Sequence, residues 1–582
     1  MPVATIQNAI RLHESGDLAA AESAYRLLLK SQPDHPMAQH YLGMILHQRG
    51  RSEEALKLVR KSLAGASDVP DFHCNLAIIL RDTGRLEDAV AALCRAIRMK
   101  PRYPQALNNL GDALRMLGKT AEARSVLEQS IEITPAPEAI NNLALVCVDE
   151  KNFAEAAELS RQVLRQHPAN STAQKTLARA LRGGGDLPGS IAAWQSAVKQ
   201  NPKDPEAHVG LADAQRAAGD LQNAIKAYEQ ASALKPNWPE CLTNYSAALF
   251  DTAQVDRAIE VGRKAVRLAP KNHEARFNLS LALLCAGEFR EGWEFYESRW
   301  HCEGFEGTLA PLPQPAWDGS DLNGKTILLR SEQGCGDAIQ FARYIPLLAQ
   351  RGATVVLQCQ TELTDLLAGV PGLSRIVSRE EDPGPFDVHL PLLSTARRFH
   401  TTPQTIPQQI PYLQPDPARV DLWTDRISGL HGLKCGLVWA GNPLHHHDKN
   451  RSLPPQILAP LAAAPGVSFV SLQKNSTTLP PLPGILNIAP DLHNFADTAA
   501  ALSQLDLLIT ADTSIAHLAG AMALPVWTLI PHAPDWRWML AQDRTAWYPT
   551  MRLFRQSTPG DWPTVLQRVV SELKSTGSRV AA

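Results

Sequence analysis

Residues 105–135 read QALNNLGDALRMLGKTAEARSVLEQSIEITP and contain the pattern that decides the fold of the first half of the chain. Apolar residues such as Leu107, Leu110 and Leu114 recur at helical spacing. Gly118 permits a tight turn, and Ala123 allows two helices to approach closely. Proline cannot continue a helix, so Pro135 ends the second one. The stretch therefore predicts a hairpin of two helices.

The same three positions recur along the chain, for example 34 residues apart at Gly50 and Gly84. The glycines are Gly16, Gly50, Gly84, Gly118, Gly185, Gly219 and Gly287; the alanines are Ala21, Ala55, Ala89, Ala123, Ala156, Ala224 and Ala258; the prolines are Pro33, Pro101, Pro135, Pro168, Pro202, Pro236 and Pro270. Lys151 and Ala253 stand in the glycine position, Ser190 and Gly292 in the alanine position, and Ser67 in the proline position. A shared period of this kind predicts an array of stacked hairpins.

The period and its residues resemble the tetratricopeptide repeat family, and about nine units cover residues 3–305. This resemblance implies an α-solenoid whose concave face binds a protein or peptide partner. Four asparagines recur on the first helix of their units: Asn75, Asn109, Asn142 and Asn244. In related solenoids an asparagine ladder there grips peptide backbone, so these residues are candidates for an acceptor groove. Hydrogen bonds to local backbone are the alternative role.

Composition limits the classes of function. The 582 residues carry a net charge of -2 and show no basic stripe, which argues against nucleic-acid binding. The nine cysteines contain no C-x-x-C pair, so neither a zinc site nor a disulfide framework is indicated. We expect no transmembrane segment and no signal peptide, because no apolar run has the required length and residue 1 leads directly into the first repeat. A cytoplasmic location is the corresponding expectation.

The pattern changes near residue 306, where a proline-rich junction (307–317) leads to alternating strands and helices. Strands are expected at 325–330, 354–359, 386–392, 434–440, 468–473, 505–510 and 525–530, and helices at 337–348, 362–367, 455–463, 495–504 and 514–523. A second proline-rich stretch (402–417) separates two α/β halves, residues 306–410 and 411–582. Two parallel sheets facing each other across a cleft are the predicted architecture.

Two loops at carboxyl ends of expected strands carry polar residues, where sites in such folds lie. The first, SEQGCGD at 331–337, contains Gly334 and Gly336, which permit close approach of a ligand, and Asp337 at the start of a helix. A helix N-cap is the alternative role for Asp337.

The second loop is ADTSIAHLAG at 511–520. We expect Asp512 to cap the helix that follows, while the N–H groups of Thr513 and Ser514 face a diphosphate. His517 is a candidate contact to the phosphate or sugar of a donor. Its alternative is a buried histidine bonded to backbone.

These two loops resemble the GT-B glycosyltransferases, closest to the bacterial lipopolysaccharide heptosyltransferase family, over residues 320–575. The resemblance implies that Asp337 is the catalytic base and that Asp512 and Thr513 bind the donor diphosphate of a nucleotide-sugar. That donor is a substrate, and no cofactor is implied. The family usually has glycine after the D-T pair, whereas this chain has Ser514, so the sugar pocket is expected to differ.

A third loop, 439–452, follows the first strand of the second half and contains Lys449 and Arg451. Their charges are suited to a leaving nucleoside diphosphate without a metal. The three histidines at 445–447 invite a metal site, but consecutive side chains point in different directions, so no metal is expected. A solvated basic surface is the alternative for the whole loop.

The segment 535–555 is rich in tryptophan, tyrosine and arginine. Trp536, Trp538, Trp547 and Tyr548 are expected mainly to pack the terminal helix against the two halves, with stacking on a nucleotide base as the alternative. Arg537 is a weaker site candidate.

The whole plan resembles the protein O-GlcNAc transferases in architecture alone. The leading hypothesis is an inverting, metal-independent glycosyltransferase that moves a hexose or heptose onto an acceptor, such as a protein hydroxyl, held by the repeats. Asp337 deprotonates that hydroxyl in this scheme. The competing hypothesis is a non-enzymatic adaptor with a degenerate glycosyltransferase fold. A third has a glycan or lipid-linked sugar as acceptor.

Overall fold

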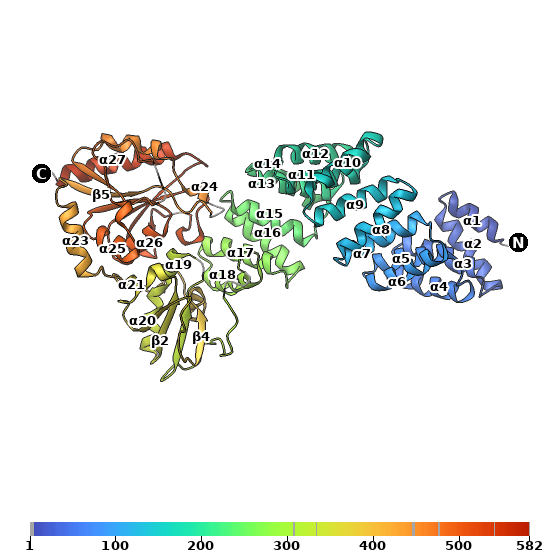
Figure 1. Ribbon diagram of the computed structural model, residues 1–582, viewed down its shortest axis with the longest axis horizontal. Helices are drawn as coiled ribbons and strands as arrows, with labels where there is room; N and C mark the ends of the chain where they lie inside the picture. Colours follow the sequence, from blue (N-terminus) through green and yellow to red (C-terminus); the bar gives the residue numbers. More distant parts are fainter. Residues whose placement is uncertain are drawn as a thin grey trace. The chain divides into compact units, whose positions relative to one another are not determined.

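The structure is a computed structural model that describes residues 5–305, 309–332, 334–444, 448–474, 476, 478–540 and 542–580, with side chains up to residue 576. It consists of two compact units, Met1–Pro236 (unit 1) and Asn237–Ala582 (unit 2) (Figure 1). Each unit is built differently, the first from helices and the second from helices followed by two sheets.

Unit 1 is a run of helical hairpins, as the repeat pattern predicts. Its helices are α1 (Ile6–Glu14), α2 (Leu18–Ser31), α3 (Pro36–Gln48), α4 (Ser52–Gly65), α5 (Pro70–Asp82), α6 (Leu86–Met99), α7 (Pro104–Met116), α8 (Thr120–Ile133), α9 (Pro137–Asp149), α10 (Phe153–Gln166), α11 (Ser171–Gly183), α12 (Leu187–Gln200), α13 (Pro205–Ala217) and α14 (Leu221–Leu234). Many of the first helices of a hairpin begin with proline, whose missing N–H is harmless at the first helical position. The tetratricopeptide solenoid is therefore confirmed.

The turn between the two helices of a hairpin uses left-handed backbone. Gly118 has φ 74°, and the replacements Lys151 and Ala253 keep the same conformation with φ 60° and 59°. A side chain in this region costs roughly 1–2 kcal/mol. The hairpin geometry is thus imposed by the packed helices, even where glycine is missing.

The periodic alanines lie where the helices of a hairpin touch. Ala123 and Ala224 are fully buried, and so is their replacement Ser190, whose hydroxyl donates to the carbonyl of Ala178 at 2.8 Å. The terminal prolines follow the second helix closely: α8 ends at Ile133, two residues before Pro135. These positions confirm the predicted roles of alanine and proline.

Unit 2 begins with helices that continue the repeat: α15 (Pro239–Phe250), α16 (Val255–Leu268), α17 (His273–Ala286) and α18 (Phe289–Tyr296), followed by the 3-10 helix η1 (Glu297–His301). The end of this run, α18 and η1, packs onto the region around the first sheet. The indole N–H of Trp293 donates to the carbonyl of Thr401 at 3.1 Å, and Arg299 is bound to Glu332. The compact units therefore divide at residue 236, although the sequence period continues to about residue 305.

The first sheet has four parallel strands in the order β3-β2-β1-β4: β1 (Thr326–Arg330), β2 (Thr354–Cys359), β3 (Leu373–Ser378) and β4 (Val388–Pro391). In register, Leu328 of β1 lies opposite Val356 of β2. The connecting helices are α19 (Cys335–Phe341), η2 (Ala342–Tyr344), α20 (Ile345–Gln350), η3 (Thr361–Leu363), α21 (Thr364–Leu367), η4 (Leu392–Ser394) and α22 (Thr395–Arg398).

The second sheet has the order β10-β11-β9-β8-β5-β6-β7 and is parallel except for the β10–β11 pair. Its strands are β5 (Leu433–Val438), β6 (Val467–Ser471), β7 (Leu486–Asn487), β8 (Leu507–Ala511), β9 (Val526–Ile530), β10 (Arg544–Thr545) and β11 (Tyr548–Arg555). Its helices are α23 (Pro417–Ile427), α24 (Asp448–Arg451), η5 (Pro455–Ala463), η6 (Ala489–Asp491), α25 (Phe495–Leu502), α26 (Ser514–Ala521), η7 (Trp536–Trp538) and α27 (Trp562–Val580). Two parallel sheets are thus confirmed.

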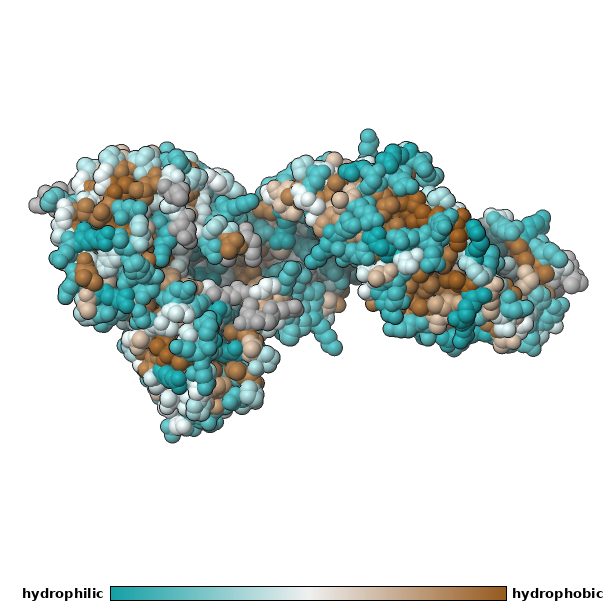
Figure 2. All heavy atoms as spheres, viewed as in Figure 1, coloured by the Kyte–Doolittle hydropathy of each residue, from teal (hydrophilic) through white to brown (hydrophobic). Residues whose placement is uncertain are grey.

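Figure 2 shows a mostly hydrophilic surface with separate hydrophobic areas. Among the described residues, no helix combines the length and the apolar character needed to cross a bilayer.

Candidate functional site

The two sheets place their loops at points where the strand order reverses. In the first sheet β1 lies between β2 and β4, and in the second β5 lies between β8 and β6. In open α/β sheets, ligands bind outside the carboxyl ends of the strands at such points. The loops 331–337, 439–452 and 511–514 all follow strands at these reversals.

Gly336 brings the loop after β1 against the loop after β8. A Cβ atom on Gly336 would lie 2.9 Å from Cδ2 of His517 and 3.4 Å from Cα of Ser514. Because real Cβ atoms do not approach so closely, any larger residue would separate α19 from α26. The structure therefore brings together residues of the two loops predicted independently from the sequence.

Asp337 lies in the first turn of α19, but it is not the helix cap. Gly334 occupies the N-cap, so the alternative role expected for Asp337 is wrong. Its carboxylate forms an ion pair with Arg537, and the two side chains are 25% and 9% exposed. Arg537 also donates to Asp535 Oδ1 (2.9 Å) and Gln340 Oε1 (2.6 Å). One guanidinium is thus shared by two carboxylates and an amide.

Asp535 was not singled out by the sequence, yet it belongs to this cluster. Burial alone would raise the pKa of Asp535, but the charge of Arg537 and hydrogen bonds from Arg537 outweigh it and lower that pKa. Conversely, Asp535 and Asp337 raise the pKa of Arg537 against the opposing effect of burial. The sequence does contain a signal for Asp535, because this residue follows β9, and β9 lies next to β8 in the sheet.

Asp512 precedes the helix and does not cap it. Thr513 is the N-cap of α26 and forms no side-chain capping bond, so the expected role of Asp512 as the cap is wrong. Asp512 is buried, with 7% of its surface exposed. Burial, followed by the nearby Asp535 carboxylate, raises the pKa of Asp512 from 3.8 to about 6. Ionising Asp512 therefore costs more free energy in the folded protein than in the unfolded chain.

Replacing Asp512 with asparagine is expected to stabilise unit 2 at pH 8 by about 3 kcal/mol, because raising the pKa of a carboxyl from 3.8 to about 6 costs that order of energy once the group is ionised. The folded pKa of Asp512 lies above the unfolded one, so the folded state holds more protons between about pH 4 and 6. The gain from Asp512→Asn therefore appears as pH rises through this window and vanishes below it.

Urea unfolding of the wild type and of Asp512→Asn at pH 4.5 and pH 8 measures this difference in stability. Exposed Asp543 provides the control, since Asp543→Asn removes a carboxylate without removing a buried charge. An equal effect of Asp512→Asn at the two pH values would contradict the argument.

His517 is buried inside the cluster and bonds to a side chain, not to backbone. Its Nδ1 lies 3.0 Å from the hydroxyl of Tyr548, and its ring stacks on Trp538 with centroids 5.3 Å apart. Burial, with the charge of Arg537, lowers the pKa of His517 to about 3. The imidazole is therefore neutral at physiological pH, so it offers a ligand no positive charge.

The loop after β5 is held by buried polar contacts. Arg451 donates to Asp448 Oδ1 at 3.2 Å, whereas Lys449 is exposed. Gln473, which the sequence did not single out, accepts the backbone N–H groups of Trp439 and Ala440 at 2.9 and 2.8 Å. The histidines at 445–447 lie outside the described residues. Within the described part of the chain, no three His, Cys, Asp or Glu side chains are grouped to hold a metal ion.

The candidate groove asparagines of unit 1 form a ladder between repeats. Each donates to a side chain of the preceding repeat: Asn75 to His40 Nε2 (3.0 Å), Asn109 to Cys74 Sγ (3.5 Å) and Asn142 to Asn108 Oδ1 (2.9 Å). Neither predicted role included such bonds. All three residues are half-buried, and so is Asn244 in unit 2.

The aromatic residues of 536–548 are buried, which agrees with a structural role, but Trp536 and Trp547 pack against residues of α18 and α19, whereas the prediction had them hold the terminal helix. Trp536 meets Trp293 edge to face at 5.2 Å, and Trp547 lies 5.8 Å from Phe341. They join the second half to α18 and α19. Arg537 differs from these aromatic residues, because it forms an ion pair with Asp337, the candidate base.

The sequence also missed a buried ion pair behind the first loop. The guanidinium of Arg299 donates to Glu332 Oε2 and Oε1 at 3.0 and 2.9 Å, and both side chains are at most 1% exposed. Glu332 also accepts the backbone N–H of Leu393 at 3.1 Å. This pair fixes the start of the loop that carries Asp337 to the end of the repeat helices.

Comparison with known proteins matches a family model described as tetratricopeptide repeat at residues 7–70, 74–138, 141–192 and 175–239. Protein FlbA of Caulobacter vibrioides is 27% identical over 323 residues, which is 50% of this chain and 53% of that protein. The chain therefore spans about half the length of this curated relative.

The solved structures that match this chain share little sequence with it, and their TM-scores are below 0.5. A tetratricopeptide repeat protein from Parabacteroides merdae is 18% identical with a TM-score of 0.36, and it covers 40% of this chain and 91% of its own. The APC/C hetero-tetramer Cut9-Hcn1 is 16% identical with a TM-score of 0.38, covering 47% and 55%. A thermophilic tetratricopeptide repeat protein from Thermus thermophilus is 24% identical with a TM-score of 0.29, covering 31% and 100%.

Proposed function

We propose that this chain, whose N-terminal part consists of tetratricopeptide repeats, transfers a sugar from a nucleotide-sugar to a hydroxyl of a protein held by the repeats. The observation that carries the proposal is the contact of Gly336 with Ser514 and His517. It gathers residues of both sheets at the strand reversals, where ligands of α/β proteins bind. The resemblance of the two loops to GT-B transferases supplies the reaction.

The donor diphosphate is assigned to the start of α26. No side chain caps this helix, so its first N–H groups remain available to an anion. Arg451 belongs to the same charge cluster, since it is among the charges that act on the pKa of Asp512 and of His517. Together these donors would neutralise the departing nucleoside diphosphate, with exposed Lys449 as a further cation.

Asp337 is assigned the role of general base. As the acceptor oxygen attacks the anomeric carbon, its proton passes to the Asp337 carboxylate, and the bond to the diphosphate breaks on the opposite face of the sugar. In the structure this carboxylate is paired with Arg537. Arg537 retains Asp535 as a partner, so Asp337 can turn to an acceptor without leaving the guanidinium uncompensated.

The acceptor is assigned to the repeats. Tetratricopeptide arrays bind extended chains on their concave face. The half-buried amides of Asn75, Asn109 and Asn142 are held in place by the preceding repeat, which lowers the entropy cost of binding a peptide backbone.

A second function, the non-enzymatic adaptor, is favoured by one observation. The ion pair with Arg537 occupies the carboxylate that a transferase would need free. In that case the two sheets serve as a structural or binding module beside the repeats.

Calorimetric titration with nucleoside diphosphates and nucleotide-sugars tests the donor site. We expect one donor to bind and Arg451→Gln to weaken it about tenfold, because a charge-assisted hydrogen bond is worth roughly 1.5–3 kcal/mol. Arg426→Gln is the matched control, since it also removes an arginine paired with an aspartate, Asp491, in the same half. No binding of any nucleotide would favour the adaptor.

A further inference from the structure

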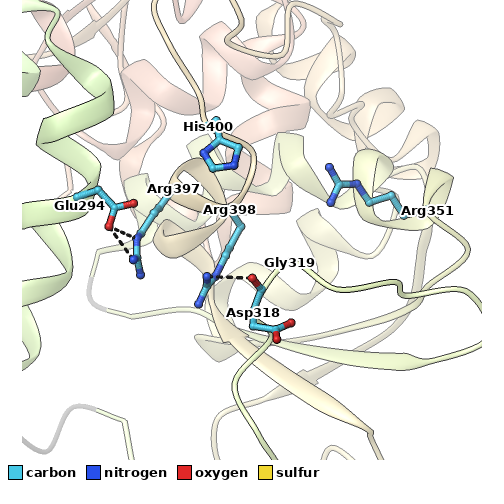
Figure 3. Close-up of a pocket in the computed structure, with 7 residues that line it drawn as sticks. All are labelled: Glu294, Asp318, Gly319, Arg351, Arg397, Arg398 and His400. Carbon is cyan, nitrogen blue, oxygen red and sulfur yellow. Dashed lines mark hydrogen bonds and ion pairs between the residues drawn. The ribbon is translucent and has the colours of Figure 1, made fainter.

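A recess in unit 2 lies apart from the candidate residues. Figure 3 shows this pocket, of about 300 Å³, whose charged lining comes from α18, α22, the end of α20 and the junction before β1. The charged and titratable residues are Arg351, Arg397, Arg398, His400, Glu294 and Asp318. None of them is in the loops of the candidate donor site.

One of the three arginines is neutralised by a carboxylate. Arg397 binds Glu294 Oε2 through two nitrogens, at 2.8 and 2.6 Å, as the dashed lines in Figure 3 show. This pair lowers the pKa of Glu294, first through the hydrogen bond from Arg397. Glu294 therefore stays ionised, and it balances Arg397.

The other two arginines keep donors that no carboxylate takes. Arg398 donates to the backbone carbonyl of Asp318 at 3.2 Å. The guanidinium of Arg351 lies over the rings of Phe399 and Trp317, 4.4 and 5.6 Å from their centroids. Among the described residues neither forms an ion pair, yet each guanidinium has five N–H donors. Stacking holds Arg351 in place, and the residue is exposed to solvent.

The carboxylate of Asp318 is the opposing charge at this pocket. It accepts the backbone N–H of Ser320 at 2.9 Å, and this bond is the main reason that its pKa is lowered. It is fully exposed to water, which screens its charge. The charge of Arg398 acts on both Glu294 and Asp318, but within the described part of the chain no carboxylate forms an ion pair with Arg351 or Arg398.

We propose that this pocket binds the phosphate group of a small molecule through Arg351 and Arg398. Planar guanidiniums match the oxygens of a phosphate and form charge-assisted bonds with them. The volume is at the lower end of small-molecule pockets, which suits a phosphomonoester better than a dinucleotide. This site is independent of the proposed sugar transfer.

Titration of the full chain with inorganic phosphate at constant ionic strength tests the proposal. We expect one phosphate to bind in this pocket, with Arg351→Gln and Arg398→Gln each weakening it roughly tenfold. Arg568→Gln is the matched control, because Arg568 is also exposed, lies 5.7 Å over Phe554 and donates to a backbone carbonyl. Arg351→Lys keeps the charge and loses the planar fork, so it should bind more weakly than the wild type.

Three results would overturn the proposal. The first is that the wild type binds no phosphate, and the second is that the Arg351 and Arg398 variants bind it as well as Arg568→Gln does. The third is that Arg451→Gln alone abolishes binding, which would place phosphate at the donor site. A parallel titration with malonate tests whether the pocket is a carboxylate site. Tighter binding of malonate than of phosphate would also contradict the proposal. Circular dichroism melting verifies that each variant is folded.

Discussion

Replacing Arg299 with methionine is expected to lower the free energy of unfolding of unit 2 by about 3–5 kcal/mol, the cost of leaving one member of a buried ion pair alone. Glu332 would lose both bonds from the guanidinium while remaining sealed from water. Burial already raises the pKa of Glu332 despite the opposing charge of Arg299. Without that charge, the carboxylate must take up a proton or the loop must open. Urea unfolding at pH 7 measures the loss.

Two further variants isolate the buried charge as the cause. The double variant Arg299→Met/Glu332→Leu is expected to recover much of the stability, since apolar replacements of buried pairs are often neutral. Arg426→Met breaks an ion pair whose members are 47% and 40% exposed, so it should cost at most about 1 kcal/mol. Equal losses for Arg299→Met and Arg426→Met would show that burial of the pair is unimportant.

Replacing Asp337 with asparagine is expected to reduce sugar transfer by roughly 10²–10⁴-fold, the usual contribution of a general base. Asparagine has nearly the same shape and can still accept a bond from Arg537, whose partner Asp535 remains. Donor affinity should therefore change little. The measurement is the transfer rate with the donor found by calorimetry, together with the donor dissociation constant of the variant.

Asp421→Asn is the control for this experiment, because Asp421 is an exposed carboxylate on α23, away from the loops of the candidate site. It should leave both the rate and the affinity unchanged. If Asp337→Asn transfers sugar at the wild-type rate, another group takes the proton. If neither protein transfers sugar although donor binds, the adaptor hypothesis gains support.

Much of the solenoid could be predicted because its rules are local. A turn glycine, a packing alanine and a terminal proline act within one hairpin, so the period of the sequence is also the period of the structure. The same locality explains why Lys151 was placed correctly at a turn, with φ 60°. The asparagine bonds were not predicted, since each depends on which residue the preceding repeat presents.

The sheets were predicted where strands are apolar and buried on both faces. β8 is buried along its whole length, as expected for a central parallel strand. β3 was missed because LSRIVS is half-exposed and contains a charge. β11, YPTMRLFR, begins with a tyrosine and a proline and was interpreted as part of an aromatic cluster.

The residues of the two loops could be found from the sequence, but their partners could not. Arg537 is 200 positions from Asp337, and Arg299 is 33 positions from Glu332. Such pairs depend on how the sheets and the last repeat helices pack, which no local pattern records. The sequence marked Arg537 as a weaker site candidate without indicating its partner, and the position of Asp535 after a strand gave a further signal.

The division at residue 236 has a consequence for how this chain was assembled during evolution. The repeat pattern runs past that point, but α18 at its end bonds and packs against residues of the sheet-bearing part. A gene fusion that joined an independent solenoid to an independent α/β domain at residue 305 would have cut through the Arg299–Glu332 pair. We therefore expect the end of the repeats, α18 and η1, to have been inherited together with the sheets.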